Sequence, residues 1–203
     1  MKHYAILAVA VTAAFLGGSA YWVWSARNTD PLAQCRGGQV GGGEIGGPFT
    51  MVNQNGETVT EADVLTQPSL VYFGYTFCPD VCPLDMSRNV EAVDILEEMG
   101  FDVTPVFVTV DPKRDTVDVV KEYAELFHPR AIALTGTDDQ VSRITKAYKA
   151  FYRVPETTDA NYLVDHSTFT YLMLPGSGFA DFFRRDATPD QMADKVSCFL
   201  EAG

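Results

Sequence analysis

Positive charge is scarce in this chain. Its 203 residues include 15 lysines and arginines against 27 aspartates and glutamates, which gives a formal net charge of −12 at pH 7. A protein that binds nucleic acid needs a basic face to neutralise phosphates, so we expect no nucleic-acid partner. The acidic excess is typical of a solvated surface, and steering of a basic partner or a cation is the alternative.

Charge is absent altogether from one segment, the 21 residues from Tyr4 to Trp24. About 20 apolar residues are needed to cross the hydrocarbon core of a bilayer. Lys2 precedes the segment, and Tyr21 and Trp22 lie near its far end, where aromatic side chains suit a membrane interface. We therefore predict a single membrane-spanning helix with its N-terminus inside and the folded domain on the periplasmic side of a bacterial inner membrane, or in the intermembrane space if the protein is mitochondrial.

A cleaved signal peptide is the alternative for this segment. Residues 5–16 would be its apolar core, and Gly18-Ser19-Ala20 is an acceptable cleavage site of small residues. The apolar run continues past that site into the aromatic residues, which favours a retained anchor.

Glycine is concentrated in the next stretch, where seven of the 16 glycines lie between positions 37 and 47. This composition is typical of a flexible linker. We therefore predict a membrane anchor at residues 1–26, a linker at 27–47 and one folded domain at 48–203.

Within that domain, strand-like apolar runs alternate with helical spacing. The runs typical of buried strands are residues 69–75, 103–110 and 131–135. The expected helices are residues 83–99, 116–127, 137–148 and 188–201. Turn signals predict two hairpins, which pair 49–52 with 58–60 and 169–174 with 179–184. This order predicts an α/β domain with a mixed sheet flanked by helices on both faces.

Cysteine is also scarce, with four in the chain. Cys78 and Cys82 follow the first buried strand and precede a helix, so we expect both thiols at the helix N-terminus, where free backbone N–H groups lower a thiol pKa. A spacing of three residues is uncommon for a redox dithiol, but positions i and i+4 share a helix face and can reach one metal ion. The spacing alone leaves metal binding and thiol–disulfide exchange both open.

The other two cysteines, Cys35 and Cys198, lie 163 positions apart, one in the linker and one in the last helix. In an exported domain we predict that they form a structural disulfide, and two free or partly paired thiols are the alternative. Closing so long a loop stabilises the folded state by on the order of 5 kcal/mol in the chain-entropy model.

Only three histidines are available as a further ligand. His3 lies beside the predicted anchor and suits the membrane interface. His128 is placed at a helix C-terminus, where a partly cationic ring complements the helix dipole. His166 lies in the turn before the second hairpin, from which it can reach the cysteines. The alternative role for His166 is that of a solvated or capped histidine in a turn.

Two thiolates and one imidazole form a soft ligand set that suits Cu(I), and the imidazole nitrogen also allows Cu(II). A structural zinc site would need a fourth protein ligand, and none is apparent. Met86 is the one soft candidate, but its helical spacing indicates core packing.

Three ordered motifs resemble a known family. They are Phe-Gly-Tyr-Thr-Phe-Cys-Pro-Asp-Val-Cys-Pro from Phe73, Val-Asp-Pro-Lys-Arg-Asp-Thr from Val110 and Val-Asp-His-Ser from Val164, before the Pro-Gly hairpin. In this order they closely resemble the Sco/SenC family of thioredoxin-fold, membrane-anchored copper proteins, which assist assembly of the copper A centre of cytochrome c oxidase. The resemblance extends from about Gly47 to the C-terminus and includes the anchor.

The resemblance implies a thioredoxin-like fold and a metal site in which Cys78, Cys82 and His166 bind one copper ion. It implies a copper chaperone whose partner is the copper A-bearing oxidase subunit, with other copper carriers as further candidates. The alternative is a thiol–disulfide oxidoreductase that reduces the copper-ligand cysteines of that subunit, with Cys78 and Cys82 as its catalytic residues. A peroxidase is disfavoured because peroxide-reducing relatives place a threonine where this chain has Tyr75.

Four acidic residues near these motifs invite hypotheses. Asp111 and Asp115 are expected to cap the turn and the helix that follow them, with an electrostatic or partner-recognition role as the alternative. Asp80 and Asp165 are candidates for orienting the metal ligands, because a metal-bound imidazole commonly donates its second N–H to an acceptor.

Overall fold

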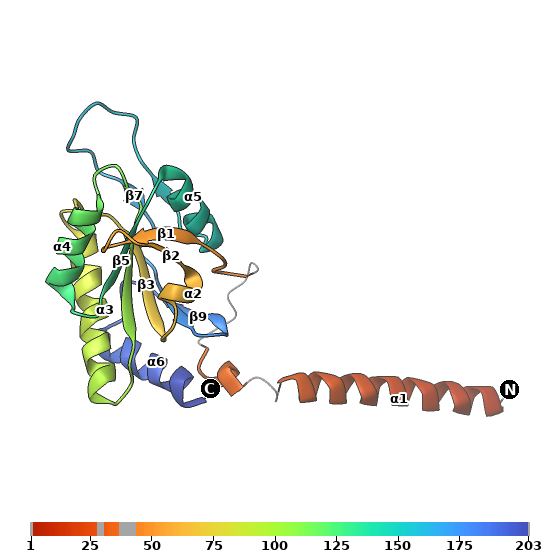
Figure 1. Ribbon diagram of the computed structural model, residues 1–203. Helices are drawn as coiled ribbons and strands as arrows, with labels where there is room; N and C mark the ends of the chain where they lie inside the picture. The colour runs from red at the N-terminus through yellow and green to blue at the C-terminus, as the bar shows by residue number, and fades with distance from the viewer. Residues whose placement is uncertain (1, 28–30, 37–43, 203) are drawn as a thin grey trace.

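The structure is a computed structural model that describes residues 2–27, 31–36 and 44–202. Helix α1 (Lys2–Arg27) stands apart from the rest of the chain in Figure 1. Its side chains are described for residues 11–25, and those from Val11 to Trp24 are exposed. Among the described residues, no helix has both the length and the apolar character needed to cross a membrane. The anchor therefore stays a prediction.

Seven strands form one mixed sheet in the order β2-β1-β5-β4-β3-β8-β9. Its centre is parallel and consists of β5 (Ile132–Thr135), β4 (Thr104–Thr109) and β3 (Ser69–Gly74). Antiparallel hairpins extend it on both sides, namely β1 (Thr50–Asn53) with β2 (Thr58–Thr60), and β8 (Thr170–Leu174) with β9 (Gly178–Phe183). All six residues of β3 are buried, which explains why its sequence is a continuous apolar run.

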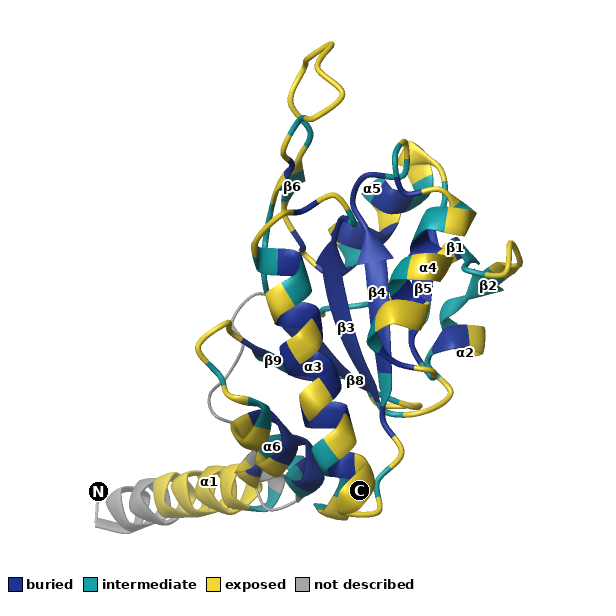
Figure 2. Ribbon diagram, turned by 90° about the vertical axis from the view of Figure 1, so that its left-hand side faces the viewer, coloured by how far each residue is buried: buried dark blue, intermediate teal, exposed yellow. Residues whose placement is uncertain are grey.

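The helices cover both faces of this sheet. They are α2 (Glu61–Val64), α3 (Val81–Glu98), α4 (Val117–Phe127), α5 (Asp138–Ala147) and α6 (Pro189–Ala202). Side chains of a strand alternate between the two faces, so β4 shows which helix lies where. Phe107 stacks on Tyr123 of α4, whereas Val106 and Val108 pack with Ile144 of α5. Helices α4 and α5 therefore lie on opposite faces, and α6 packs against α3 (Figure 2).

The predicted order of strands and helices is confirmed, with boundaries that differ by a few residues. Three short elements were not predicted: helix α2, a 3-10 turn at Pro31–Gln34, and a small ribbon of β6 (Tyr152–Arg153) with β7 (Asp165–His166). Of the predicted linker, residues 28–30 and 37–43 lie outside the described residues.

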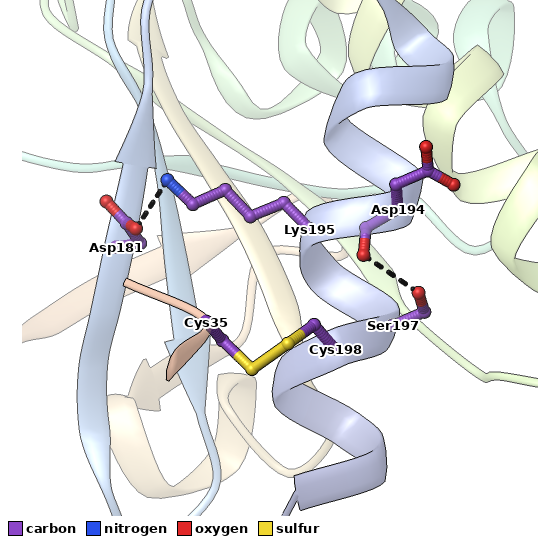
Figure 3. Close-up of a disulfide and its surroundings, with 6 residues drawn as sticks. All are labelled: Cys35, Asp181, Asp194, Lys195, Ser197 and Cys198. Carbon is purple, nitrogen blue, oxygen red and sulfur yellow. Dashed lines mark hydrogen bonds and ion pairs between the residues drawn. A yellow bond between two sulfur atoms is a disulfide. The ribbon is translucent and has the colours of Figure 1, made fainter. Parts of the chain in front are cut away.

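The predicted disulfide between Cys35 and Cys198 is confirmed, with the two Cα atoms 5.7 Å apart (Figure 3). It joins the segment after α1 to α6. Cys35 is buried in an apolar cluster that includes Phe199 and the inner face of α6. Beside it, Lys195 of α6 forms a 2.6 Å ion pair with Asp181 of β9. The N-terminal arm is thus fixed covalently to the C-terminal helix.

Candidate metal centre

The two cysteines lie where β3 gives way to α3. Cys82 is in the first turn of α3 and is fully buried, and Cys78 precedes the helix with 8 % of its surface exposed. The backbone N–H of Cys82 donates to the sulfur of Cys78 at 3.4 Å. The expectation that both thiols lie at the helix N-terminus is confirmed, but Cys78 precedes α3 and does not share its first turn with Cys82. The loop folds back so that Cys78 occupies the anion-binding position at the helix N-terminus.

This position makes the two thiols unequal. The pKa of Cys78 is lowered, first because the Cys82 thiol donates to its thiolate and then because the backbone N–H groups of Asp80 and Cys82 also donate to it. The pKa of Cys82 is raised because its proton is shared with that thiolate and because the sulfur is buried. In the metal-free pair Cys78 is therefore the first thiol to lose its proton, and Cys82 is the one that retains its proton. A metal ion that binds both sulfurs must displace it.

His166 approaches the cysteines from the β6–β7 ribbon, where it pairs with Tyr152. Its Nε2 lies 3.3 Å from Cys82 Sγ, and its Nδ1 lies 3.0 Å from the carbonyl oxygen of Ser167. An Nδ1–H that donates to this carbonyl leaves the Nε2 lone pair directed at the sulfur. The ring is half-buried and meets the edge of Tyr75 at 5.7 Å between centroids. The histidine expected in a turn thus lies on a short strand.

The structure brings Cys78, Cys82 and His166 together, with their ligand atoms all within 4.8 Å of one another. Two sulfurs and one nitrogen at this separation fit a soft cation such as copper. Met86 is 1 % exposed and belongs to the main apolar core, as its spacing predicted.

Asp85 holds Tyr72 beside the site, a role that was not predicted from the sequence. It is 3 % exposed and accepts a hydrogen bond from the Tyr72 hydroxyl at 3.0 Å and another from Arg185 at 3.1 Å. Tyr72 in turn faces the His166 ring edge-on at 6.3 Å. This burial could have been predicted from the sequence, because Asp85 follows Cys82 by three positions and therefore lies on the same helix face.

The four acidic residues near the motifs take other roles than expected. Asp115 is fully buried and accepts hydrogen bonds from the Thr76 backbone at 3.0 Å and from its hydroxyl at 2.6 Å, so it braces the cysteine loop instead of capping a helix. The Asp111 side chain also contacts another loop, because its carboxylate accepts a hydrogen bond from the Tyr162 hydroxyl at 2.8 Å. The capping hypothesis is therefore wrong for both side chains.

The orienting hypothesis fails as well. The Asp165 carboxylate pairs with Arg153 at the surface, and the ring nitrogen of His166 has the Ser167 carbonyl as its partner. Asp80 is the residue before α3, and its side chain makes no capping hydrogen bond. It acts on the site through its backbone N–H, which lowers the pKa of Cys78.

His128 lies at the C-terminal end of α4, as predicted, beside Asp94 and Glu97. Its Nδ1 accepts the backbone N–H of Arg130 at 3.0 Å, and its Nε2 lies 3.5 Å from Asp94. In this second group of acidic and histidine side chains, the His128 ring is thus held at the helix end by a backbone N–H and lies beside the Asp94 carboxylate.

Gly74 ends β3 directly beside the buried sulfur. A Cβ at this position would lie 2.9 Å from both Cys82 Sγ and Tyr72 Cε1, and 3.2 Å from Phe107 Cε2. Non-bonded carbon atoms pack best at about 3.5–4.0 Å. Only glycine leaves room for the sulfur between the strand and the helix.

We expect the substitution Gly74→Ala to lower the free energy of unfolding by about 1–3 kcal/mol, because the added methyl overpacks the core. It should also weaken metal binding, because Cys82 Sγ must move. Urea unfolding and a copper titration measure the two effects. Gly17→Ala is the control, since a Cβ there would have nothing within 4 Å. Wild-type stability and metal affinity in Gly74→Ala would contradict the expectation.

A dithiol at a helix N-terminus, after an inner strand of a mixed sheet and beside the ribbon that carries a histidine, defines a thioredoxin-like protein with a candidate site for a soft metal ion. The family model for SCO1/SenC matches residues 38–201, and the chain belongs to this family. It is 51% identical to protein SenC of Rhodobacter capsulatus over 202 residues, which are 99% of this chain and 91% of that protein.

Solved structures agree in fold. Arabidopsis thaliana ScoI with copper bound has a TM-score of 0.74 and 40% identity, over 77% of this chain and 99% of that one. Yeast Sco1 with copper bound has a TM-score of 0.75 and 35% identity, over 79% of this chain and 91% of that one. The resemblance inferred from the three motifs is thereby confirmed at the level of family and fold.

Proposed function

We propose that this chain is a copper chaperone that binds one copper ion and assists assembly of the copper A centre of cytochrome c oxidase. The ligands are Cys78, Cys82 and His166. The observation that carries the proposal is their convergence, with all ligand atoms within 4.8 Å of one another. The copper-bound ScoI and Sco1 structures, which share its fold, support the choice of metal.

Delivery of a metal ion requires that an incoming ligand reach it before the old ligands leave. The three-residue set leaves a coordination position free, unlike the closed four-ligand cage of a structural site. Cys78 lies in the loop before α3 and retains some exposure, whereas Cys82 is fully buried. We infer that the partner's ligand enters from the Cys78 side, and that Cys82 is the last to release copper.

The partner is the copper A-bearing subunit of the oxidase, and other copper carriers are candidate donors. Residues 1–26 are the proposed membrane anchor, 27–47 the linker and 48–203 the copper-binding domain. The domain then lies on the periplasmic or intermembrane-space side, where the disulfide between Cys35 and Cys198 is compatible with an oxidising compartment.

A second function is favoured by the inequality of the two thiols. A thiol with a lowered pKa beside a buried partner is typical of dithiols that reduce disulfides, because the thiolate attacks and the partner resolves the mixed disulfide. Cys78 and Cys82 would then be catalytic and would reduce the copper-ligand cysteines of the oxidase subunit, with their own oxidation to a disulfide balancing the electrons.

The histidine separates the two functions. The reduced full chain should bind one copper ion in competition with a chelator, and His166→Ala should weaken that binding roughly tenfold or more by removing a ligand. Reduction of an oxidised peptide from the copper A loop should be unchanged in His166→Ala. Reduction without copper binding in the wild-type chain would favour the reductase. Loss of both activities in His166→Ala would refute the proposed division of roles.

A further inference from the structure

Arg114 belongs to the connection between β4 and α4, but its side chain contacts other loops. Its Nη1 donates to the carbonyl oxygens of Ala160 at 3.2 Å and Tyr162 at 2.9 Å. Its Nε pairs with the buried carboxylate of Asp111, and the side chain is only 13% exposed. The guanidinium thus grips the backbone of a segment 46 to 48 positions away.

The same guanidinium lies among three aromatic rings. It is 3.6 Å from the centroid of Tyr162, 5.0 Å from that of Phe77 and 5.6 Å from that of Tyr75. Phe77 and Tyr75 belong to the loop that carries Cys78. An arginine held over aromatic faces gains cation–π attraction in addition to its hydrogen bonds. One side chain therefore joins the cysteine loop to the segment around Tyr162.

That segment leads directly to the third proposed ligand. Residues 154–164 connect β6 to β7, contain no helix or strand and project beyond the ribbon in Figure 2. Most of their side chains are exposed. The ribbon itself has only two pairs, Tyr152 with His166 and Arg153 with Asp165. A two-stranded ribbon is marginally stable alone, and a long irregular loop adds conformational freedom. Beyond the ribbon and the hydrogen bonds between Phe151 and Ser167 beside it, His166 therefore depends on tertiary contacts to keep its place.

We propose that Arg114 is the positioning residue for His166. By clamping residues 160–162 onto Asp111 and the aromatic side chains of the cysteine loop, it holds the imidazole at 3.3 Å from Cys82 Sγ. Lysine cannot replace it, because a single ammonium lacks the planar fork that serves a carboxylate and two carbonyls while stacking on a ring. The expected effect on copper affinity rests on the proposed copper function, whereas the clamp itself requires no metal.

The first test measures copper affinity of the reduced full chain. Arg114→Lys, which keeps the charge, should weaken copper binding by about tenfold or more, as loss of a group that orients a metal ligand typically does. In a His166→Ala background the same substitution should have no further effect. Arg130→Lys is the matched control, because Arg130 pairs with Glu97 and Asp102 at the surface. An equal loss in the His166→Ala background would overturn the proposal and place the effect at the cysteines.

The second test uses the reduced, metal-free chain. Amide hydrogen exchange across residues 160–166 should accelerate by about tenfold or more in Arg114→Lys, with β3 and β4 unchanged, because the clamp opens locally without global unfolding. Unchanged exchange there would overturn the proposal. If the wild-type chain binds no copper, the proposed function fails, and this exchange still decides whether the clamp exists. Acceleration throughout the core would show a general destabilisation and would also overturn it.

Discussion

Replacing Cys82 by serine is expected to reduce copper binding by the full chain from one ion to background. Cys82 is fully buried, and its sulfur lies between the other two proposed ligands, in contact with Cys78 and 3.3 Å from His166 Nε2. A serine hydroxyl stays protonated at neutral pH and is a hard ligand, so it cannot replace a thiolate for a soft cation. Metal analysis after gel filtration under reducing conditions measures the loss.

Met86→Leu is the matched control for this variant. Met86 lies one turn further along α3, is equally buried and belongs to the apolar core. A methionine-to-leucine exchange conserves volume and usually costs less than about 1.5 kcal/mol, so copper should be retained. Cys78→Ser should behave like Cys82→Ser. Undiminished copper in Cys82→Ser would refute the three-ligand site, and loss of copper in Met86→Leu would indicate a fourth ligand.

The elements predicted correctly are the longer ones, in which every residue of a segment follows one pattern of burial. Strand β3 is buried on both faces, so its residues are apolar without alternation. Helix α2 has four residues and the β6–β7 ribbon two per strand, which is too short for any hydrophobic period to show. A capping box joins Thr60 to Asp63, and it was the one available signal for α2.

The candidate site was also only partly predictable, because the sequence identifies its residue types but not their tertiary contacts. Cysteine and histidine were selected by their chemistry, although 84 positions separate Cys82 from His166. The partners of Asp111 and Asp115 were not predictable, because they depend on which loops meet at one end of the sheet. The acceptor for His166 is a backbone carbonyl, which any residue could supply at position 167.

The disulfide and the proposed copper thiols lie at different ends of the domain. Figure 1 shows α6, which carries Cys198, at the lower end of the sheet and the β6–β7 ribbon near its upper end. Among the described cysteines, Cys78 and Cys82 are the free pair. The fold therefore separates a cross-link that fixes the N-terminal arm from two thiols that must stay reduced to bind metal.

Replacing both Cys35 and Cys198 by alanine is expected to lower the free energy of unfolding by about 2–5 kcal/mol. The bond closes a loop of 163 positions, so its loss frees almost the entire unfolded chain from a constraint. The upper value of this range applies if the N-terminal arm stays docked on α6 without the disulfide. If the buried Cys35 segment detaches, its apolar contacts are lost as well. Urea unfolding should show a lower midpoint and a steeper dependence on urea, because an unlinked chain exposes more surface.

Chemical reduction of the wild-type chain should reproduce the effect of the double alanine variant, and reduction of that variant should change nothing further. Cys78→Ala with Cys82→Ala is the matched control, because it removes two buried sulfurs but no cross-link. The two sites lie at different ends of the domain and should act independently, so reduction should cost this control the same free energy as the wild-type chain. An unfolding midpoint that does not respond to reduction in either protein would contradict a stabilising disulfide.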